Sequence, residues 1–292
     1  MLTLEAESWV WYGVTSLIVL ARIVSRRMLL GSFKRFQIDD YLVLLAMATQ
    51  TVFIYFLIVV DNTPNNLIDP NNPEDNVTFT PENIQERIRG SKAIFVVEQM
   101  QCCTIWIIKA CILLMCSRIT INTEQKFIVK IAAVYTTVCF IVMETLCFAA
   151  WCRPFSQYWA IPPANIQCAT YLNHLITNLV VNLSSDLLIF FIPFPLFFRS
   201  SLDLKQKFVL SCIFAVGIFT MVCAILSKTY SFIDPFSNNW TYWYVRESST
   251  AIICANLPPT WPLIRKVFAI KSPNSTKANY YARSARPINA HS

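Results

Sequence analysis

Four polar residues recur at every fourth position of one apolar stretch: His174, Asn178, Asn182 and Asp186. In an α-helix this spacing stacks the side chains on one face, which predicts a polar stripe facing the interior of a helix bundle. Lys109 lies at a similar depth in another apolar stretch. Ionisable groups inside a membrane are costly unless they are paired or hydrated, so these residues form a candidate intramembrane polar network. The spacing allows an ion pair between Lys109 and Asp186.

Three acids form a second candidate group. Glu98, Glu144 and Glu247 come from three different apolar stretches, each near its predicted outer end. Converging acids below an outer vestibule predict a ligand-facing cluster. Lys228 and Arg246 lie at a similar depth, so the alternative interpretation is that these bases pair with the acids and fix helix packing.

Several other chemistries lack the residues that they need. With only His174 and His291, the chain does not supply the ligands of a membrane di-iron or bis-histidine haem centre. It contains no Gly-x-Ser-x-Gly elbow, phosphate loop or Cys-x-x-Cys motif. Residues 248–264 of the last apolar block contain no lysine that could hold retinal. The sequence therefore predicts no catalytic residue, no metal site and no cofactor.

Long apolar blocks must position these side chains. Of 292 residues, 55% are hydrophobic and 14% charged, so the apolar surface is too large for one globule and predicts a lipid environment. About 20 apolar residues cross the hydrocarbon layer as a helix. Seven such blocks lie at approximately residues 9–24, 41–60, 94–117, 127–151, 171–198, 208–227 and 244–264. The predicted fold is an all-α membrane protein, a seven-transmembrane helix bundle over residues 1–268.

Positive charge sets the predicted orientation. Of the 24 lysines and arginines, 17 fall in four alternate segments, at residues 22–35, 118–130, 199–207 and 265–286. Cytoplasmic connections retain positive charge, so the bias predicts an external N-terminus and a cytoplasmic C-terminus, in a multi-pass protein of the plasma membrane. The formal charge of +7 does not form the continuous basic face that nucleic acid requires. Residues 269–292 contain no acid and predict a disordered basic tail.

The predicted outer loops carry two candidate glycosylation sites. Asn76 and Asn239 each begin an Asn-x-Thr sequon on the outer side. Residues 61–89 are rich in Pro, Asn and acids and predict a loop of about 30 residues, too Pro-rich for one long helix. Asp69, Asn71 and Asp75 lie in this loop with the spacing of alternate calcium ligands, but Pro73 interrupts the pattern, which favours a solvated loop.

Cysteines bracket the next outer loop. A bridge between Cys152 and Cys168 would close a short loop, and such bridges are favoured outside the cytosol. A disulfide from either of them to Cys102 or Cys103 is the alternative, because disulfide connectivity cannot be deduced from sequence.

The predicted inner ends carry charges and prolines. Asp39 and Asp40 open the second block, where they can cap the helix or pair with Arg26, Arg27 or Arg35. Arg22, near the inner end of the first block, is expected to extend its charge to the membrane surface. The fifth and seventh blocks contain prolines that should kink or unwind their inner halves, at Pro193, Pro195, Pro258, Pro259 and Pro262.

Several motifs together resemble the fungal rhodopsin-domain family, integral membrane proteins grouped with pathogenicity-associated fungal G-protein-coupled-receptor-like proteins. They are Ile38-Asp39-Asp40-Tyr41, residues 109–118, residues 152–159 with Cys168, Asp186 with residues 192–195, and Glu247 with residues 251–258. The chain departs from the family pattern at Cys116, where a Tyr is usual, and at Lys228, where an Arg is usual. The resemblance implies a seven-helix, receptor-like fold in which "rhodopsin" refers to shape and not to a pigment.

The leading functional hypothesis is a signalling receptor. An unknown small ligand would enter from outside and shift the proline-containing helices, changing an inner face presented to a heterotrimeric G protein. Arg118, Lys205 and Lys207 would form that cytoplasmic coupling face together with the tail. The alternatives are a small ion- or proton-coupled transporter that uses Lys109, Asp186 and the outer acids, or an accessory membrane scaffold.

Overall fold

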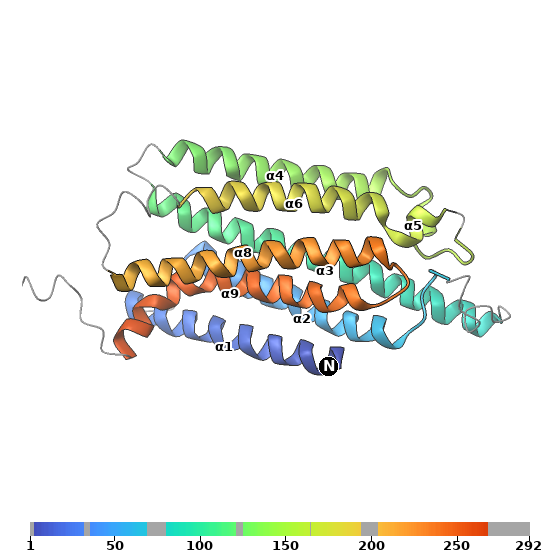
Figure 1. The fold of residues 1–292 in the computed structure, drawn as a ribbon, viewed down its shortest axis with the longest axis horizontal. Coiled ribbons are helices and arrows are strands. Elements are labelled where there is room, and N and C mark those ends of the chain that lie inside the picture. The colour runs from blue at the N-terminus through green and yellow to red at the C-terminus, as the bar shows by residue number, and fades with distance from the viewer. Residues whose placement is uncertain are drawn as a thin grey trace, which may run out of the picture.

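The computed structural model describes residues 3–31, 36–68, 80–120, 125–163, 165–193 and 204–267, and these residues form helices and connections without a strand. In chain order the elements are α1 (Leu4–Leu30), α2 (Ile38–Asn62), α3 (Pro81–Ile119), α4 (Gln125–Ala149), η2 (Phe155–Trp159), α5 (Ile166–Thr170), α6 (Leu172–Phe191), α8 (Leu204–Ile233) and α9 (Asn239–Val267). The long helices run side by side along one direction (Figure 1). Asn76, Asp69, Asp75, Pro195 and the tail at residues 269–292 lie outside the described residues, as do the side chains of Lys205, Lys207 and Pro262.

Six of the helices are long and apolar enough to cross a membrane: α1, α2, α3, α4, α6 and α8. Their outward faces carry large apolar side chains, such as Leu17 on α1 and Phe127 on α4, which are 68% and 70% exposed. Surface of this kind requires lipid around the bundle. The chain is therefore a multi-pass helical membrane protein. The predicted seventh span corresponds to α9, which has 29 residues but a more polar composition.

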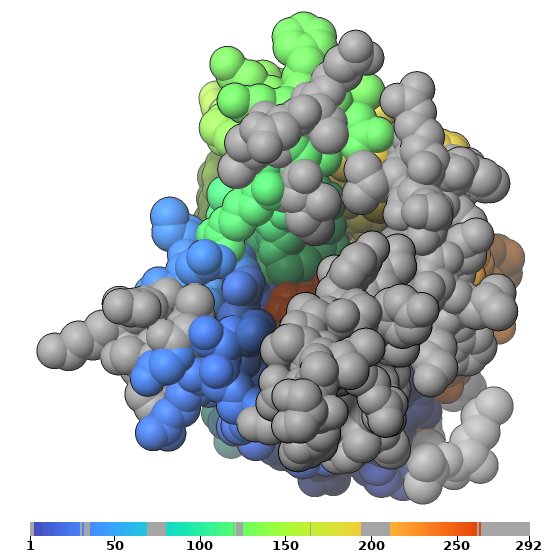
Figure 2. Space-filling view, turned by 90° about the vertical axis from the view of Figure 1, so that its left-hand side faces the viewer, coloured from blue at the N-terminus to red at the C-terminus, as the bar shows by residue number. Residues whose placement is uncertain are grey.

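The helix α9 lies inside the bundle. It packs along α1 and α8 and also contacts α2 and α3, whereas α4 and α6 pack against each other on the far side of α3. Figure 2 shows the same arrangement from one end, with α9 at depth between α1 and α2 on one side and α3 and α4 on the other. This relatively polar long helix thus has little contact with the surroundings of the bundle.

Local sequence signals set the helix ends. The hydroxyl of Thr3 accepts a hydrogen bond from the backbone N–H of Ala6 at the start of α1, and Gly31 ends that helix with a φ of 71°. A left-handed residue at this position is normally glycine, because a Cβ would clash. The helix α2 begins with a capping box between Gln37 and Asp40.

Two expectations about these ends are wrong. The predicted outer loop does not extend to Arg89, because α3 begins at Pro81, after an N-cap at Thr80. As a result α3 extends beyond the neighbouring helices at the outer end (Figure 1). The helix α6 ends at Phe191, so Pro193 follows the described helix instead of kinking it.

In contrast, α9 remains helical through Pro258 and Pro259. The last part of α9 turns away from the line of its first part (Figure 1). Prolines inside a helix remove a backbone hydrogen bond and produce such bends.

Candidate functional site

The polar stripe on α6 faces the bundle interior. His174, Asn178 and Asn182 are all less than a tenth exposed, and the side chain of Asp186 is 21% exposed. The three buried residues lie on the inward face together with Leu175, Ser185 and Ile189. The fourfold spacing therefore places one polar face of α6 against α3 and α9.

Lys109 on α3 forms the centre of this network. Its Nζ lies 3.0 Å from Oδ1 of Asp186 and donates hydrogen bonds to the backbone carbonyl of Asn182 at 2.8 Å and to the hydroxyl of Ser185 at 2.6 Å. These contacts use all three protons of the ammonium group. A buried charge is tolerated only when it is paired and hydrogen-bonded in this way, so the set joins α3 firmly to α6.

Glu247 on α9 continues the network. Its carboxylate accepts hydrogen bonds from the side-chain amides of Asn182 at 3.0 Å and Gln101 at 3.3 Å. A cavity of about 130 Å³ adjoins these groups and is lined in part by Lys109, Asp186 and Glu247. A basic residue and two acids from three helices thus surround one interior space.

A second buried group lies nearer the outer end. The hydroxyl of Tyr244 donates to the carboxylate of Glu98 at 2.9 Å and accepts from the ammonium group of Lys228. All three residues are at most 5% exposed. Nε2 of His174 lies 4.0 Å from Glu98. Neither ring nitrogen of His174 has a hydrogen-bond partner among the described residues.

Glu98 also lines a cavity of about 50 Å³ together with Asn65, Tyr171 and Trp240. A space that holds one water needs roughly 10–15 Å³, so this cavity accommodates a few waters or a small polar group. The hydroxyl of Tyr171 has no hydrogen-bond partner among the described residues. The outer cavity therefore presents one acid and an unpartnered hydroxyl to an occupant.

The three outer acids contact different partners. Glu98 and Glu247 both contact groups on α9 or α6, but Glu144 on α4 accepts a hydrogen bond from the thiol of Cys102 at 3.3 Å. No described hydrogen bond joins any of the three acids to another. Arg246 pairs with Glu7 on α1 at 2.7 Å, and not with an acid of the predicted cluster. Among the described residues, no hydrogen bond joins Glu144 to Lys109, Asp186 or Glu247.

The most extensive ion network among the described residues lies at the predicted inner end. Asp39 is completely buried, and its carboxylate pairs with Arg22, Arg26 and Arg118. Asp40 pairs with Arg22 at 3.0 Å and with Arg26 at 3.3 Å. We call these five residues the inner ion cluster. The cluster connects α1, α2 and α3.

Asp39 and Asp40 pair with Arg26, one of the partners expected from the sequence, but the expectation for Arg22 is wrong. Arg22 is 1% exposed and does not extend to the membrane surface as expected. Its guanidinium group also donates to the backbone carbonyl of Ala255 and to the side chain of Asn256, both at 3.4 Å. The available signal was the spacing of Arg22 and Arg26, which places two arginines on one helix face opposite an Asp-Asp pair. Arg118, predicted for the coupling face, is 34% exposed and donates to Gln37 as well as pairing with Asp39.

A disulfide-bonded aromatic cap lies between the outer ends of α4 and α6. Cys152 and Cys168 form a disulfide with a Cα–Cα distance of 5.9 Å, which confirms the favoured pairing, and Cys102 and Cys103 are free. Next to it, the rings of Tyr158 and Tyr171 stack with centroids 5.0 Å apart. Burial raises the pKa of Tyr158, so its hydroxyl remains protonated at neutral pH and donates to the carbonyl of Cys147 at 2.9 Å.

The predicted glycosylation site Asn239 is exposed and is the first residue of α9. The neighbouring sequon residue Thr241 is buried, and its hydroxyl donates to the carbonyl of Asn238 at 2.5 Å. The glycan on Asn239 stays a prediction.

Comparison with known proteins supports the resemblance noted in the motifs. A family model, the fungal rhodopsin domain, matches residues 21–266, which include the inner ion cluster, Lys109, Asp186 and Glu247. No curated protein and no solved structure matches the chain. The match covers well over half of the sequence, and the chain therefore belongs to the fungal rhodopsin domain family.

Proposed function

We propose that the chain is a receptor-like protein of the plasma membrane that senses an extracellular cue and signals to a cytoplasmic G protein. The observation that carries the proposal is the set of contacts along α9. Tyr244 on this helix contacts Glu98 beside the outer cavity, Glu247 contacts the α6 stripe, and Asn256 contacts Arg22 of the inner ion cluster. One interior helix thus has polar contacts at the outer end, the middle and the inner end of the bundle.

A ligand can act on such a bundle only through a difference in its affinity for two states. The outer cavity offers an acid and a hydroxyl, which suit a small ligand with a cationic or hydrogen-bond-donating group. Competition for Glu98 would weaken its contact with Tyr244 and release α9 to move. The inner end would respond because Arg22 contacts both α9 and the Asp pair on α2.

The inner face would carry the output. Of the three arginines in the inner ion cluster, Arg118 is the most exposed. Breaking its pair with Asp39 would therefore expose a cationic side chain between α2 and α3. Lys205 and Lys207 on α8 and the basic tail complete the proposed coupling face by sequence position. Helix shifts that alter such a surface are a general means of signalling across a membrane.

The test does not require a known ligand. The full-length protein is reconstituted into nanodiscs with a heterotrimeric G protein, and nucleotide exchange on the Gα subunit is measured. Tyr244→Phe removes the hydroxyl that joins Glu98 to Lys228, so we expect basal exchange to rise severalfold above that of the wild type. Tyr242→Phe on the same helix is the matched control, because its hydroxyl has no described hydrogen bond, and it should leave exchange unchanged. Exchange equal to that of empty nanodiscs in the wild type and in Tyr244→Phe would contradict the receptor proposal.

One observation favours a second candidate, an ion- or proton-coupled transporter. Lys109, Asp186 and Glu247 line a common cavity in the middle of the bundle, and ionisable groups at that depth are typical of ion pathways. Proteoliposomes that hold a pH-sensitive dye would reveal proton movement under an imposed gradient. Asp186→Asn should abolish that movement, whereas Glu144→Gln, outside the network, should not. Proton movement with this pattern, together with absent nucleotide exchange, would favour the transporter.

A further inference from the structure

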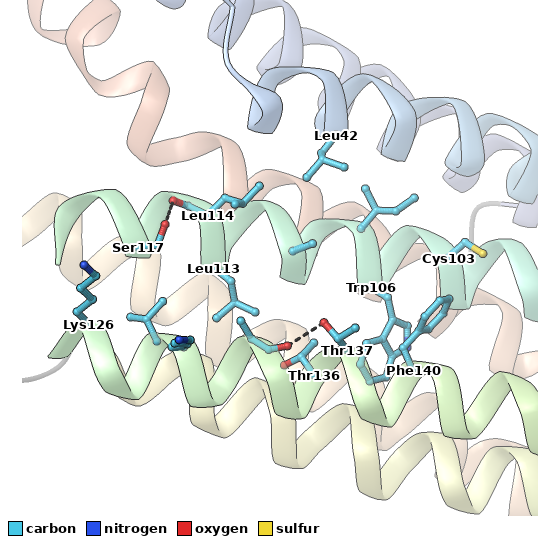
Figure 3. A pocket seen from close by; sticks show the side chains of 15 residues that line it. Leu42, Cys103, Trp106, Leu113, Leu114, Ser117, Lys126, Thr136, Thr137 and Phe140 are labelled. Atoms are coloured by element: carbon cyan, nitrogen blue, oxygen red, sulfur yellow. Dashed lines mark hydrogen bonds between the residues drawn. The ribbon is translucent and has the colours of Figure 1, made fainter. Parts of the chain in front are cut away.

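A large cavity in the described part of the chain is separate from the network of α3, α6 and α9. It is a groove of about 760 Å³ between α3 and α4, bordered on one side by Leu42 of α2 (Figure 3). Apolar side chains such as Leu113 and Val129 form most of its wall. Thr137 in its lining is exposed, so the groove opens sideways on the lipid-facing surface of the bundle. Its volume lies in the range of sites that bury a small organic ligand, about 300–1,000 Å³.

The groove runs along the membrane-spanning candidates α3 and α4 and is long enough for a hydrocarbon chain. It extends along α3 from Cys103 to Ser117, and these residues are 14 positions apart, or about 21 Å at 1.5 Å per residue. The hydrocarbon core of a bilayer is about 30 Å thick, so the groove is longer than one leaflet. An occupant that enters from the side, out of the lipid, fits this shape.

One end of the groove is cationic. Lys126 and Lys130 line it at the start of α4, one helical turn apart, and both are exposed. Figure 3 shows Lys126 at this end of the groove. Among the described residues, no acid forms an ion pair with either lysine. By the predicted orientation these lysines lie at the cytoplasmic face, where anionic lipid gathers. The charge at this end complements an anionic head group.

The wall also contains polar groups without partners. The hydroxyl of Thr136 and the indole N–H of Trp106 are buried and have no hydrogen-bond partner among the described residues. The two side chains are 5% and 6% exposed, and both line the groove. Buried polar groups nearly always have a partner, so these two indicate an occupant with acceptor atoms. Thr136 is six positions from Lys130, or about 9 Å along α4, a spacing that suits an ester carbonyl below a head-group phosphate.

We propose that the α3–α4 groove binds an anionic glycerophospholipid. The phosphate would lie between Lys126 and Lys130, an ester carbonyl would accept a hydrogen bond from Thr136, and one acyl chain would fill the apolar part beside Leu113. A second copy of this chain, docked through the same surface about a twofold axis, would bring two lysine pairs together, which is unfavourable. The charge therefore favours a lipid over a second copy.

Trp106 makes the test direct, because a brominated acyl chain quenches indole fluorescence on contact. The full-length protein is placed in phosphatidylcholine nanodiscs with or without brominated phosphatidylserine. Lipid-facing tryptophans such as Trp9, which is 51% exposed, are quenched by any brominated lipid around the bundle. We expect a further quenching component that depends on the anionic head group and is lost in Trp106→Phe. The double variant Lys126→Gln, Lys130→Gln should weaken the apparent affinity for brominated phosphatidylserine at least about tenfold. Each lysine near an anionic surface contributes on the order of a tenfold factor or less to binding, and the double variant lacks both lysines. Lys92→Gln at the opposite end of the bundle is the charge control and should bind as the wild type does.

A second pair of variants tests the groove itself. Ala133→Phe fills the groove, whereas Val134→Phe adds the same ring at an exposed neighbouring position of α4. We expect Ala133→Phe to abolish quenching of Trp106 and Val134→Phe to retain it, with similar thermal midpoints. Equal quenching by brominated phosphatidylcholine would overturn the head-group assignment. Cross-linked dimers that Ala133→Phe removes would show that a second copy occupies the groove, and would overturn the proposal as well.

Discussion

Asp39 has no exposed surface, and three arginines from two helices provide its counter-charges. Taking one partner from a buried ion pair costs about 3–5 kcal/mol, because the remaining charge stays in a medium of low polarity. Pairs that water can reach contribute about 1 kcal/mol or less. The three arginines differ in burial, at 1%, 17% and 34% exposed for Arg22, Arg26 and Arg118, so they should differ in their contribution to stability.

We therefore predict a graded loss of stability. Arg22→Met should lower the thermal midpoint of the purified protein most, Arg26→Met less, and Arg118→Met least. Differential scanning fluorimetry in a mild detergent measures the series, with Arg153→Met on the opposite, outer side as a control for loss of a surface charge. Equal midpoints for Arg22→Met and Arg118→Met would show that burial does not set the strength of these pairs.

The sequence predicts some of these side-chain contacts and not others. The Lys109–Asp186 pair follows from depth, because both residues lie a similar distance below the outer ends of helices that run the same way. The burial of Arg22 does not follow from the sequence, because arginines near span ends usually extend to the interface. Only the packing of α1 against α2 shows that Asp39 and Asp40 are within reach of Arg22. The role of Tyr244 depends on the relative rotation of α3, α8 and α9, which sequence spacing within one helix does not determine.

At the scale of elements, the outer extension of α3 is held by a close backbone approach. A Cβ added to Gly90 would lie 2.1 Å from the carbonyl oxygen of Pro64, which follows α2. The same addition at Gly13 on α1 would meet nothing within 4 Å. Glycine inside a helix is about 1 kcal/mol less favourable than alanine when nothing else intervenes.

Opposite effects are therefore expected from the same substitution. Gly13→Ala should raise the thermal midpoint slightly, and Gly90→Ala should lower it, because the segment at Pro64 must move. Both variants are compared with the wild type in the same detergent. A midpoint for Gly90→Ala at or above that of the wild type would indicate that the α2–α3 connection adjusts without cost.

The existence of the long helices is largely predictable, because apolar blocks of about 20 residues have few alternatives. Helix ends outside the apolar blocks are harder to predict. Residues 81–93 extend α3 although they are polar, and the signals for this were local: Thr80 as an N-cap, followed by Pro81 at the first helical position. The many prolines of the preceding loop obscured that start signal.

The disulfide fixes a second element, the cap between α4 and α6. Closing a loop of this length, with 16 positions between Cys152 and Cys168, contributes about 3 kcal/mol. Cys152→Ser should therefore lower the thermal midpoint to that of the reduced wild type, and a reducing agent should have no further effect on the variant. Cys212→Ser, which removes an exposed free thiol, is the matched control. A Cys152→Ser midpoint equal to the wild-type value would mean that aromatic stacking alone holds the cap.

At the scale of the whole molecule, the path of α9 determines the topology. A helix that faces lipid must be apolar on the outside, but a helix surrounded by others can carry polar groups without meeting lipid. The polar residues of α9 are of the second kind: Tyr244, Glu247 and Asn256 are all at most 3% exposed. Average polarity therefore underestimates the capacity of α9 to cross a membrane. The first residues of α1 and the last turns of α9 lie at opposite ends of the bundle (Figure 1).

We predict from this arrangement that the two chain ends lie on opposite sides of the membrane, with the N-terminus outside. An epitope tag at the N-terminus should bind antibody on intact spheroplasts, and a tag at the C-terminus should bind only after permeabilisation. Asn239→Gln adds an independent measurement: it should remove a glycan-dependent shift in electrophoretic mobility, whereas Asn274→Gln should not, because that sequon lies on the predicted cytoplasmic side. Both tags reacting on the same side would mean that the six apolar helices cross and α9 does not. The contacts of α9 would then be unable to connect an outer cavity to a cytoplasmic partner.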